Sequence, residues 1–542
     1  MNTRQLQTDK NQKLYHALLG ILLVCALAMM MLLSYWACKY SYYGAVDGRT
    51  RGVLVGDKTW AHIAVFLAAS LCAMGIDKVL MKKDKSQQEK ICLCTLIVTS
   101  VIAFILGVFY VCKNPYYPVG DQINTTAFAA YCRDGNFSML SIGGYVGMYQ
   151  QQKGLAILYE ILFTLFGDFN YRPAKILHVV WWILTILAGY GFLKLNTDRP
   201  VFRMLYCVMM LGCFPLLFYL PYIYGDVLSI SFGIILFYGV AAYEHSGQKR
   251  YIALASFAAG LAVLARKNTW IILIGVGIYA VLVCLKKKKG QYLLAGFAIL
   301  LTAALTVKAV DVMYEYRSGY PSDIGIPSIL WIAMGLQETD GMAGVYNRYQ
   351  QTTFAEHDFQ QEPAAQEGKE YIRERLREFR ENPAMARDFF KRKLEDQWIE
   401  PLFSSLKATE SFDTDGEPLS SGITSLYYGN IHETVWKLAN YYQSIVYLAG
   451  LVLGIALCGR WWQKKEIPTA LWLPLIGIVG GFLFSIIWEA QSRYVFPYYV
   501  FLILFVPMGL YETGRAISRL PKHRRKTTEQ NQTQEESLRE IA

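Results

Sequence analysis

The sequence NPYYPVGDQ occupies residues 114–122 and follows directly on a long apolar run. The chain then stays polar and aromatic as far as YQQQK at residues 149–153, and a short apolar segment occupies residues 155–167. An acid, a lysine and many tyrosines thus lie between hydrophobic segments, where a purely structural connection would need none of them. The stretch 114–168 is therefore our first candidate for a functional site.

The composition around this stretch indicates an α-helical protein that crosses a membrane many times. Of the 542 residues, 54% are apolar and only 18% are charged, whereas a soluble protein is about 25% charged. Many apolar runs approach the ~20 residues that a helix needs to span a bilayer. The first run, residues 15–36, is too long for a signal-peptide core and has no small-residue cleavage site, so we expect it to be retained.

Twelve apolar runs are predicted to be spans. They occupy residues 15–36, 60–76, 91–112, 178–193, 205–220, 227–243, 251–265, 270–285, 292–310, 444–458, 470–487 and 494–511. The segment 155–166 would reverse all later topology if it crossed the membrane. We expect instead an interfacial helix that lies in the outer leaflet.

Basic residues predict the orientation. The short loops on one side of the predicted spans contain 17 Lys and Arg, and those on the other side contain 7. Short loops rich in Lys and Arg are cytoplasmic. We therefore expect a protein of the cell (plasma) membrane with both termini in the cytoplasm and the stretch 114–168 outside. These loops account for the net charge of +11, so we expect no nucleic-acid partner.

The predicted organisation has five parts. They are two N-terminal spans with a basic loop (1–90), a transmembrane core (91–311) with an outer loop at 113–172, a small, mainly helical extracytoplasmic domain (312–441), three last spans (442–511) and a basic cytoplasmic tail (512–542) that we expect to be disordered.

Two features stand out inside the predicted outer domain. Residues 367–394 have apolar side chains at helical spacing, and Asn382-Pro383 predicts a break between two amphipathic helices. Residues 411–421 are rich in Asp, Gly and Ser and predict a loop.

The eleven cysteines predict no disulfide and no metal site, because most lie inside apolar runs and none has metal-ligand spacing. Seven scattered histidines disfavour a His-based metal site. The chain also lacks a Walker-type phosphate loop and the H-E-x-x-H and C-x-x-C motifs. Asn124 and Asn136 begin glycosylation triplets, which are common by chance.

Charged residues gather on the predicted outer side. Asp121 is either a turn aspartate, or a general base or charge partner for a sugar hydroxyl or an ammonium group. Asp226 ends the outer tip 221–226 and is either merely solvated or faces Asp121 across a cavity. Arg266 and Lys267 separate two runs too short for the ~30 Å hydrocarbon core, so they either snorkel to headgroups or bind a lipid phosphate.

Four further residues are candidates. Lys153 begins the interfacial helix and would lie at headgroup depth, where it could bind a phosphate. Glu489, Arg493 and Tyr494 lie in or just after a short outer loop, either as ordinary span-end residues or as part of the site.

The order of these motifs resembles the GT-C superfamily of polytopic glycosyltransferases, especially the bacterial protein-mannosyltransferase and aminoarabinose-transferase-like branch. The resemblance covers about residues 91–511. Its four motifs are GDQ at 120–122, YQQQKGL at 149–155 with an amphipathic helix ending in LFGD at 165–168, YGD at 224–226 and RYVFP at 493–497. The chain departs from the branch in having QKGL at 152–155 where Glu-Lys-Pro-Pro is common, and in two extra N-terminal spans.

The resemblance implies a reaction and roles for these residues. The donor would be a polyprenyl-phosphate sugar bound from the outer membrane leaflet, and the acceptor would be an extracytoplasmic polymer, lipid or protein. Asp121 would activate or position the acceptor, with help from Asp226. The basic residues implied to stabilise the departing phosphate are Lys153, Arg266, Lys267 and Arg493. Those expected to contact the substrates are Gln122, Tyr149, Gln152, Tyr224 and Tyr494. No soluble cofactor is implied, and a divalent metal is left open because the branch's Glu is missing.

Two other functions compete with this hypothesis. A transporter or flippase for a lipid phosphate or an anionic solute would more often place charges at the membrane midplane in broken helices, whereas these charges cluster at one side. A non-catalytic envelope assembly protein would bind a polymer with its outer domain and would not depend on Asp121.

Overall fold

The structure is a computed structural model that describes residues 3–43, 53–322, 324–410 and 420–519. It is built from α-helices, with two small antiparallel hairpins: β1 (Tyr40–Tyr43) pairs with β2 (Val53–Gly56), and β3 (Glu338–Thr339) pairs with β4 (Met342–Ala343). Most of the predicted loop at 411–421 and nearly all of the predicted disordered tail lie outside the described residues.

Nine helices of the described chain are long and apolar enough to cross a membrane. They are α1 (Thr3–Lys39), α2 (Thr59–Leu80), α3 (Lys85–Lys113), α7 (Arg172–Asn196), α10 (Asp226–Ser246), α12 (Trp270–Lys287), α13 (Gln291–Ser318), α20 (Asn430–Trp462) and α21 (Trp472–Ile487). A tenth candidate is the bent pair of α22 (Ser492–Leu502) and Val506–Arg519, with an angle of 57° between its halves. The prediction of a helical membrane protein is confirmed.

Two predicted spans correspond to shorter helices. Residues 205–220 contain the end of α8 (Pro200–Leu211) and the short α9 (Phe214–Phe218), separated by a break. Residues 251–265 lie in α11 (Arg250–Ala265), whose 16 residues extend about 24 Å. The number of twelve spans therefore stays a prediction.

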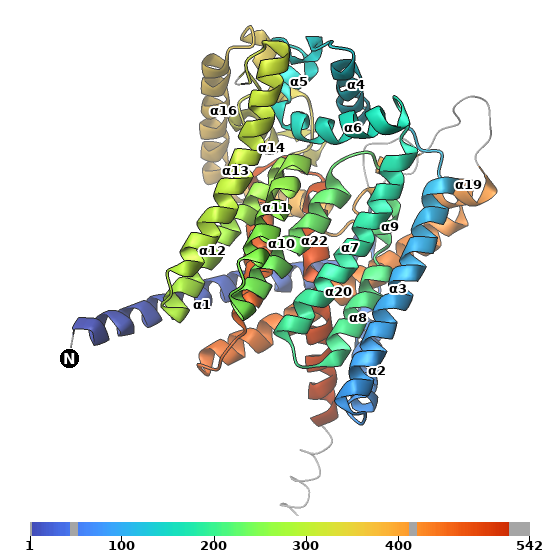
Figure 1. Ribbon diagram of the computed structural model, residues 1–542, viewed down its shortest axis with the longest axis vertical. Helices are drawn as coiled ribbons and strands as arrows, with labels where there is room; N and C mark the ends of the chain where they lie inside the picture. Colours follow the sequence, from blue (N-terminus) through green and yellow to red (C-terminus); the bar gives the residue numbers. More distant parts are fainter. Residues whose placement is uncertain (1–2, 44–52, 323, 411–419, 520–542) are drawn as a thin grey trace, which may run out of the picture.

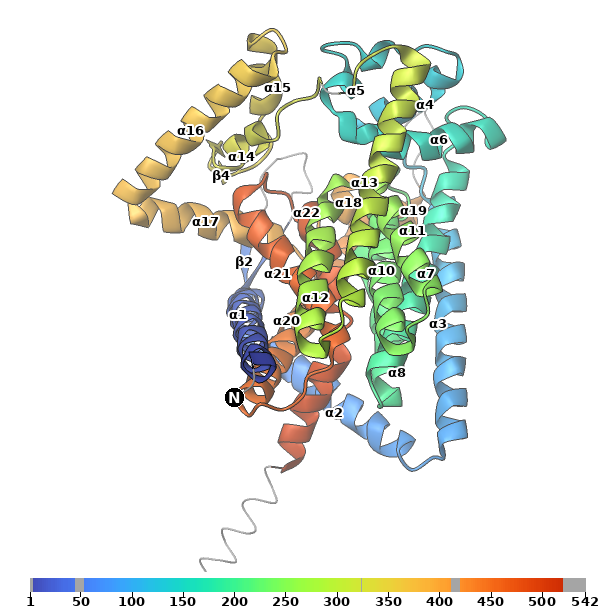
Figure 2. The same ribbon diagram turned by 60° about the vertical axis from the view of Figure 1, so that its left-hand side comes forward.

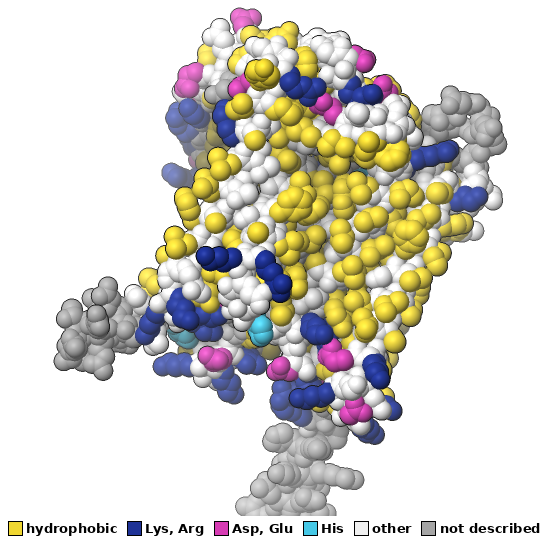
Figure 3. All heavy atoms as spheres, in the orientation of Figure 1, with side chains coloured by type: hydrophobic (Ala, Val, Ile, Leu, Met, Phe, Trp, Pro, Cys, Tyr) yellow, Lys and Arg dark blue, Asp and Glu magenta, His cyan; other side chains and the backbone are white. Residues whose placement is uncertain are grey.

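The bundle has an enclosed centre and an apolar surface. In the most apolar stretch of α10, 83% of the residues are buried, whereas the corresponding share is 28% for α3 and 22% for α13. Helix α10 packs against α7 and α11. A helix that is apolar all round is stable only when enclosed or in lipid. Figure 3 shows a broad hydrophobic band across the middle of the visible face, with Lys and Arg most dense at the lower end of that face.

An outer layer of shorter helices covers the upper end of the bundle (Figures 1 and 2). Its first part contains α4 (Asp121–Arg133), α5 (Tyr145–Met148) and α6 (Lys153–Phe166). Its second part contains α14 (Ile329–Gly335), α15 (Tyr349–Glu356), α16 (Gln361–Glu381), α17 (Pro383–Trp398), α18 (Ser405–Ala408) and α19 (Ser421–Tyr428). In Figure 1, α6 lies across the ends of the long helices. Its predicted place in the outer leaflet stays a prediction.

The second part of the layer confirms one prediction and shifts two boundaries. The helix break at Asn382 is confirmed, and the Asn382 side chain accepts a hydrogen bond from the backbone N–H of Met385 at the start of α17. However, α13 continues to Ser318 and α20 begins at Asn430. The predicted domain limits at 311/312 and 441/442 therefore fall inside helices.

Candidate active site

A cavity of about 660 Å³ lies where the upper ends of the bundle meet the outer layer. Many of the residues selected from the sequence line it, although they come from segments far apart in the chain. These residues are Asp121, Tyr149, Gln152, Tyr224, Arg266, Lys267, Arg493 and Tyr494. Gln122, Lys153 and Asp226 are not among the described lining residues.

Asp121 presents an accessible carboxylate to the cavity. It begins α4 directly after Gly120, whose φ of 57° is a left-handed conformation that glycine adopts without strain. An acid in the first turn is also favoured by the helix dipole. The Tyr145 hydroxyl donates a hydrogen bond of 2.8 Å to Asp121 Oδ1, and the Asp121 side chain is exposed. Asp121 is thus oriented by a neighbour and still open to a ligand.

Glu489 supplies a second carboxyl group to the same cavity. It lies in the loop between α21 and α22 and is only 6% exposed. Burial, followed by the negative charge of Asp121, raises the pKa of Glu489 to about 8, against the opposing effects of Tyr494, Arg266 and Lys393. Glu489 therefore holds its proton near neutral pH, so the cavity combines an accessible acid with a protonated buried one.

Two arginines surround a pair of tyrosine rings in the cavity wall. The Arg266 guanidinium lies 5.2 Å from the Tyr224 ring and 5.4 Å from the Tyr494 ring. The Arg493 guanidinium lies 5.4 Å from each of the same rings. Cation–π contacts of this kind fix a guanidinium without consuming its N–H donors. The two arginines can therefore present donors to an anion in the cavity.

Asp226 lies behind this arrangement. It begins α10, is 1% exposed, and its Oδ1 lies 3.4 Å from Nη2 of Arg266. Neither of its carboxylate oxygens has a hydrogen-bond partner in the described chain. Asp226 thus pairs with Arg266 from the protein side and does not face Asp121 across open space.

The two predicted glutamines have different positions. Gln152 Nε2 donates to the Tyr224 hydroxyl, and Gln152 Oε1 accepts from Thr125 Oγ1 at 3.2 Å. Gln152 therefore joins the outer layer to the tip before α10. Gln122 is 3% exposed and donates to the Tyr116 hydroxyl at 2.5 Å, so it stabilises the turn that leads into α4.

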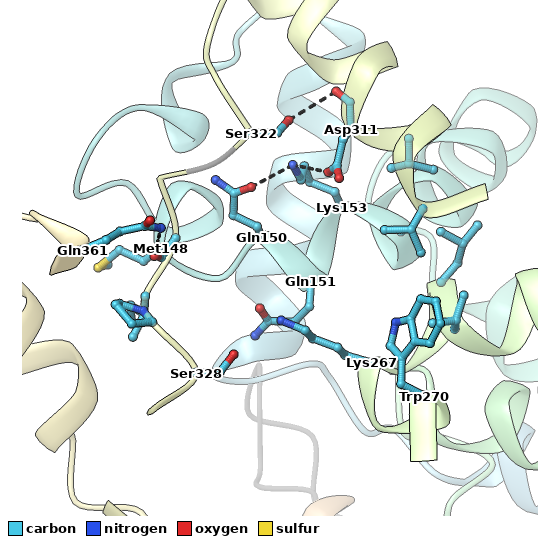
Figure 4. A pocket seen from close by; sticks show the side chains of 18 residues that line it. Met148, Gln150, Gln151, Lys153, Lys267, Trp270, Asp311, Ser322, Ser328 and Gln361 are labelled. Carbon is cyan, nitrogen blue, oxygen red and sulfur yellow. Dashed lines mark hydrogen bonds and ion pairs between the residues drawn. The ribbon is translucent and has the colours of Figure 1, made fainter. Parts of the chain in front are cut away.

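Lys153 faces a neighbouring pocket of about 370 Å³ (Figure 4). Lys153 is 2% exposed, and its Nζ lies 2.5 Å from Asp311 Oδ1 and donates at 3.0 Å to Gln150 Oε1. Apolar side chains from α11, α12 and α13 form one wall: Val263, Leu264, Trp270, Val307 and Val310. The two cavities are adjacent, since both are lined by Gln151, Lys267 and Ser328.

The outer layer contributes lining residues that the sequence did not indicate. They are Trp331, Tyr346, Arg348, Gln350 and Gln351, together with Tyr145 from α5 and Trp488 and Gln491 from the loop before α22. Glu489 was predicted either as an ordinary span-end residue or as part of the site, and the structure places it in the cavity. These contacts join segments far apart in sequence, and helical periodicity carries no signal for them.

Residues 15–513 match a protein family described as "Conserved hypothetical integral membrane protein". The chain belongs to this family. The match includes every residue that lines the two cavities. A comparison with curated proteins and one with solved structures gave no match.

The described residues do not suit a resident divalent metal. No group of three or more His, Cys, Asp or Glu side chains in the described ranges could hold a metal ion. The acids that line the larger cavity in this part of the chain are Asp121 and Glu489, and Glu489 is protonated near neutral pH. All eleven cysteines, which lie within the described residues, are free thiols.

Proposed function

We propose that this membrane protein is a glycosyltransferase that moves a sugar from a polyprenyl-phosphate donor to an extracytoplasmic acceptor. The observation that carries the proposal is that the accessible carboxylate of Asp121 and the guanidinium groups of Arg266 and Arg493 line one cavity. A carboxylate can accept a proton from an attacking hydroxyl. Fixed cations can stabilise the charge that develops on a leaving phosphate.

The proposed reaction is a single displacement. The acceptor hydroxyl gives its proton to Asp121, and its oxygen attacks the anomeric carbon of the donor sugar. The bond from that carbon to the phosphate oxygen breaks, and the phosphate leaves with the electron pair. Arg266 and Arg493 stabilise the new charge on the phosphate, and Asp226 holds Arg266 in place from behind.

The pocket beside Lys153 could hold the lipid chain of the proposed donor. Its apolar wall on α11, α12 and α13 suits a polyprenyl chain, while Lys267 and Gln151 line both this pocket and the larger cavity. We place the lipid phosphate near Lys267, Arg266 and Arg493. Lys153 is engaged by Asp311, so in this arrangement it contacts the phosphate only if the phosphate displaces that carboxylate.

The proposed orientation places the cavity outside the cell. Lys and Arg are densest at the opposite end of the bundle (Figure 3), and short loops rich in these residues are cytoplasmic. Both termini would then be cytoplasmic and the protein would lie in the plasma membrane. A donor in the outer leaflet could enter the cavity from the side of the apolar band.

The test is a transfer assay with the purified chain in detergent. Radiolabelled polyprenyl-phosphate sugars are offered together with cell-envelope acceptors, and labelled acceptor is measured. We expect transfer by the wild type and a loss of at least about 100-fold in Asp121→Asn. Asp134→Asn, the same change at an exposed position, is the control and should retain activity.

Two outcomes would overturn the proposal. Full activity of Asp121→Asn would remove the catalytic role of that residue. Movement of the intact labelled lipid between leaflets of a vesicle, without any labelled acceptor, would favour a flippase.

A further inference from the structure

We propose that the acceptor is an uncharged carbohydrate, bound against a wall of the larger cavity that the outer layer and the loop between α21 and α22 form together. We call this the acceptor wall and define it by Trp331, Tyr346, Gln350, Gln351, Trp488 and Gln491. The inference rests on the proposed glycosyltransferase function, because only a transferase has an acceptor.

The acceptor wall contains aromatic ring faces. Trp331 and Trp488 are stacked, with ring centroids 6.1 Å apart and an interplanar angle of 5°. Phe484 also stacks on Trp488 at 4.9 Å, so the half-buried Trp331 is the indole that offers a face to a ligand. Tyr149 packs edge-on against Trp331, with a centroid distance of 6.3 Å and an angle of 71°, and Tyr346 is 48% exposed. A sugar ring has an apolar face of C–H groups, which packs well against a flat aromatic surface held in one orientation.

A buried amide lines the same cavity. Gln350 is fully buried and lies next to the Tyr149 hydroxyl, but in the described chain neither its Nε2 nor its Oε1 makes a hydrogen bond of ordinary geometry. The same holds for Oε1 of Gln491 and Nε of Arg493, which line the same cavity. A buried polar atom without a partner costs free energy, so a cluster of them indicates a ligand that supplies both donors and acceptors. Carbohydrate hydroxyls do both.

The charge pattern separates the outer-layer part of this wall (Trp331, Tyr346, Gln350 and Gln351) from the proposed phosphate site. Arg266, Lys267 and Arg493 lie on the bundle side of the cavity, at the junction of α11 and α12 and at the start of α22. The described lining residues from the outer layer between 328 and 351 include one charged side chain, Arg348. An anionic headgroup would find its partners on the bundle side, whereas the acceptor wall suits an uncharged polyol.

The position of the wall fits an acceptor that arrives from outside. Figure 2 shows α14 and α15 above the ends of the long helices, on the side away from the basic end of the bundle. Asp121 lies in the same cavity, on α4. A sugar hydroxyl held on the wall can therefore meet Asp121 while the donor lipid stays in the membrane.

The experiment measures binding without any donor. The purified full-length chain in detergent is titrated with maltotriose, mannotriose, cellotriose or chitotriose, and binding is followed by saturation-transfer NMR. We expect at least one trisaccharide to bind saturably. Trp331→Ala and Gln350→Met should weaken that binding at least tenfold, while Trp331→Phe, which keeps a ring, should weaken it about threefold or less.

A matched control lies at the other end of the molecule. Trp462, at the end of α20, is 80% exposed, and Trp462→Ala should leave trisaccharide binding unchanged. Folding of each variant is checked by its unfolding temperature in detergent. If Trp331→Ala does not fold, Gln351→Ala, at a half-buried position, replaces it, with an expected loss of at least threefold.

Three results would overturn the inference: no trisaccharide saturates, the wall variants bind as well as wild type, or a Ser/Thr-rich peptide binds there in place of the sugars. The two proposals fail separately. Sugar binding that needs Trp331, in a protein without transfer activity, would retain the carbohydrate site and remove the glycosyltransferase. Transfer to a peptide, without sugar binding, would retain the glycosyltransferase and remove the carbohydrate site.

Discussion

The Tyr494 hydroxyl points at Glu489 and lies 3.4 Å from each of its carboxylate oxygens. Tyr494 is itself held between the guanidinium groups of Arg266 and Arg493. The buried acid is thus linked through one ring to the two cations that we assign to the phosphate. A change in the protonation of Glu489 should therefore change both the unfolding free energy and the transfer activity.

Stability should depend on pH through Glu489. Its pKa is about 8 in the folded protein and 4.5 as the ordinary value. The stabilisation of the protonated form is complete below pH 4.5 and is lost as the pH rises toward and through about 8. Glu489→Gln cannot titrate, so between pH 5 and pH 8.5 the wild type should lose a few kcal/mol of unfolding free energy relative to the variant.

This difference is measured by unfolding in detergent across that pH range. Asp121, Arg266, Lys393 and Tyr494 act on Glu489, and all are unchanged in the variant. Parallel stability curves for wild type and Glu489→Gln would show that Glu489 titrates normally.

Tyr145 should act as a positioning residue for Asp121. Its hydroxyl donates to Asp121 Oδ1 at 2.8 Å, and a hydrogen bond to a charged group contributes about 1.5–3 kcal/mol. Tyr145→Phe should therefore lower kcat for transfer by about 10- to 100-fold, with little change in KM. Tyr131→Phe, at a 43% exposed position on α4, is the control. An unchanged kcat in Tyr145→Phe would mean that Asp121 needs no such support.

Asp226 should contribute to stability through Arg266. Both groups are largely buried, and Asp226 Oδ1 is 3.4 Å from Arg266 Nη2. Removing one partner of a buried pair costs about 3–5 kcal/mol, because the other charge is left uncompensated. Asp226→Asn should therefore lower the unfolding free energy in detergent by about 3–5 kcal/mol. Asp388→Asn breaks an exposed pair with Arg392 and should cost under about 1 kcal/mol; equal losses in the two variants would contradict the prediction.

The sequence predicted those features that depend on a short stretch of chain. The twelve apolar runs predicted as spans include the nine helices that are long and apolar enough to cross a membrane, and Asn382-Pro383 predicted the break between α16 and α17. Asp226 was predicted either to be solvated at a tip or to face Asp121 across a cavity, but the structure buries it beside Arg266. A tip can be buried by a loop from a distant part of the chain, and hydropathy does not report that.

The candidate site was only partly predictable for the same reason. The outer acids and bases could be grouped by their expected side of the membrane, and many of them do meet in one cavity. Lys153 instead pairs with Asp311 on α13, and Gln350 enters from the outer layer. Such partners depend on long-range packing, which has no period in the sequence.

Two chain segments approach closely at Gly225, and this position should not tolerate a side chain. A Cβ atom at Gly225 would lie 2.0 Å from the carbonyl oxygen of Ala265, which directly precedes Arg266. The backbone would have to move apart, and overpacking of this kind costs about 1–3 kcal/mol or more. Gly225→Ala should therefore lower both the unfolding temperature and transfer. Gly75→Ala, where nothing lies within 4 Å, should be tolerated, and equal behaviour of the two variants would argue against this packing.

The orientation of the cavity can be tested by cysteine labelling in intact cells. Asp134 is exposed in the outer layer beyond α4, and Lys289 is exposed in the loop between α12 and α13 at the opposite end. A membrane-impermeant maleimide should label Asp134→Cys in intact cells, and Lys289→Cys only after permeabilisation. Asp226→Cys would be a poor reporter, because the native side chain is 1% exposed.

The eleven native thiols make the unmodified chain a necessary control for this labelling. Those in the apolar band should react slowly, because maleimide needs a thiolate in water. Labelling of Lys289→Cys but not Asp134→Cys in intact cells would place the cavity in the cytoplasm. A donor in the outer leaflet could then not reach Asp121, so this one reversal would remove the proposed reaction whatever the chemistry of the cavity.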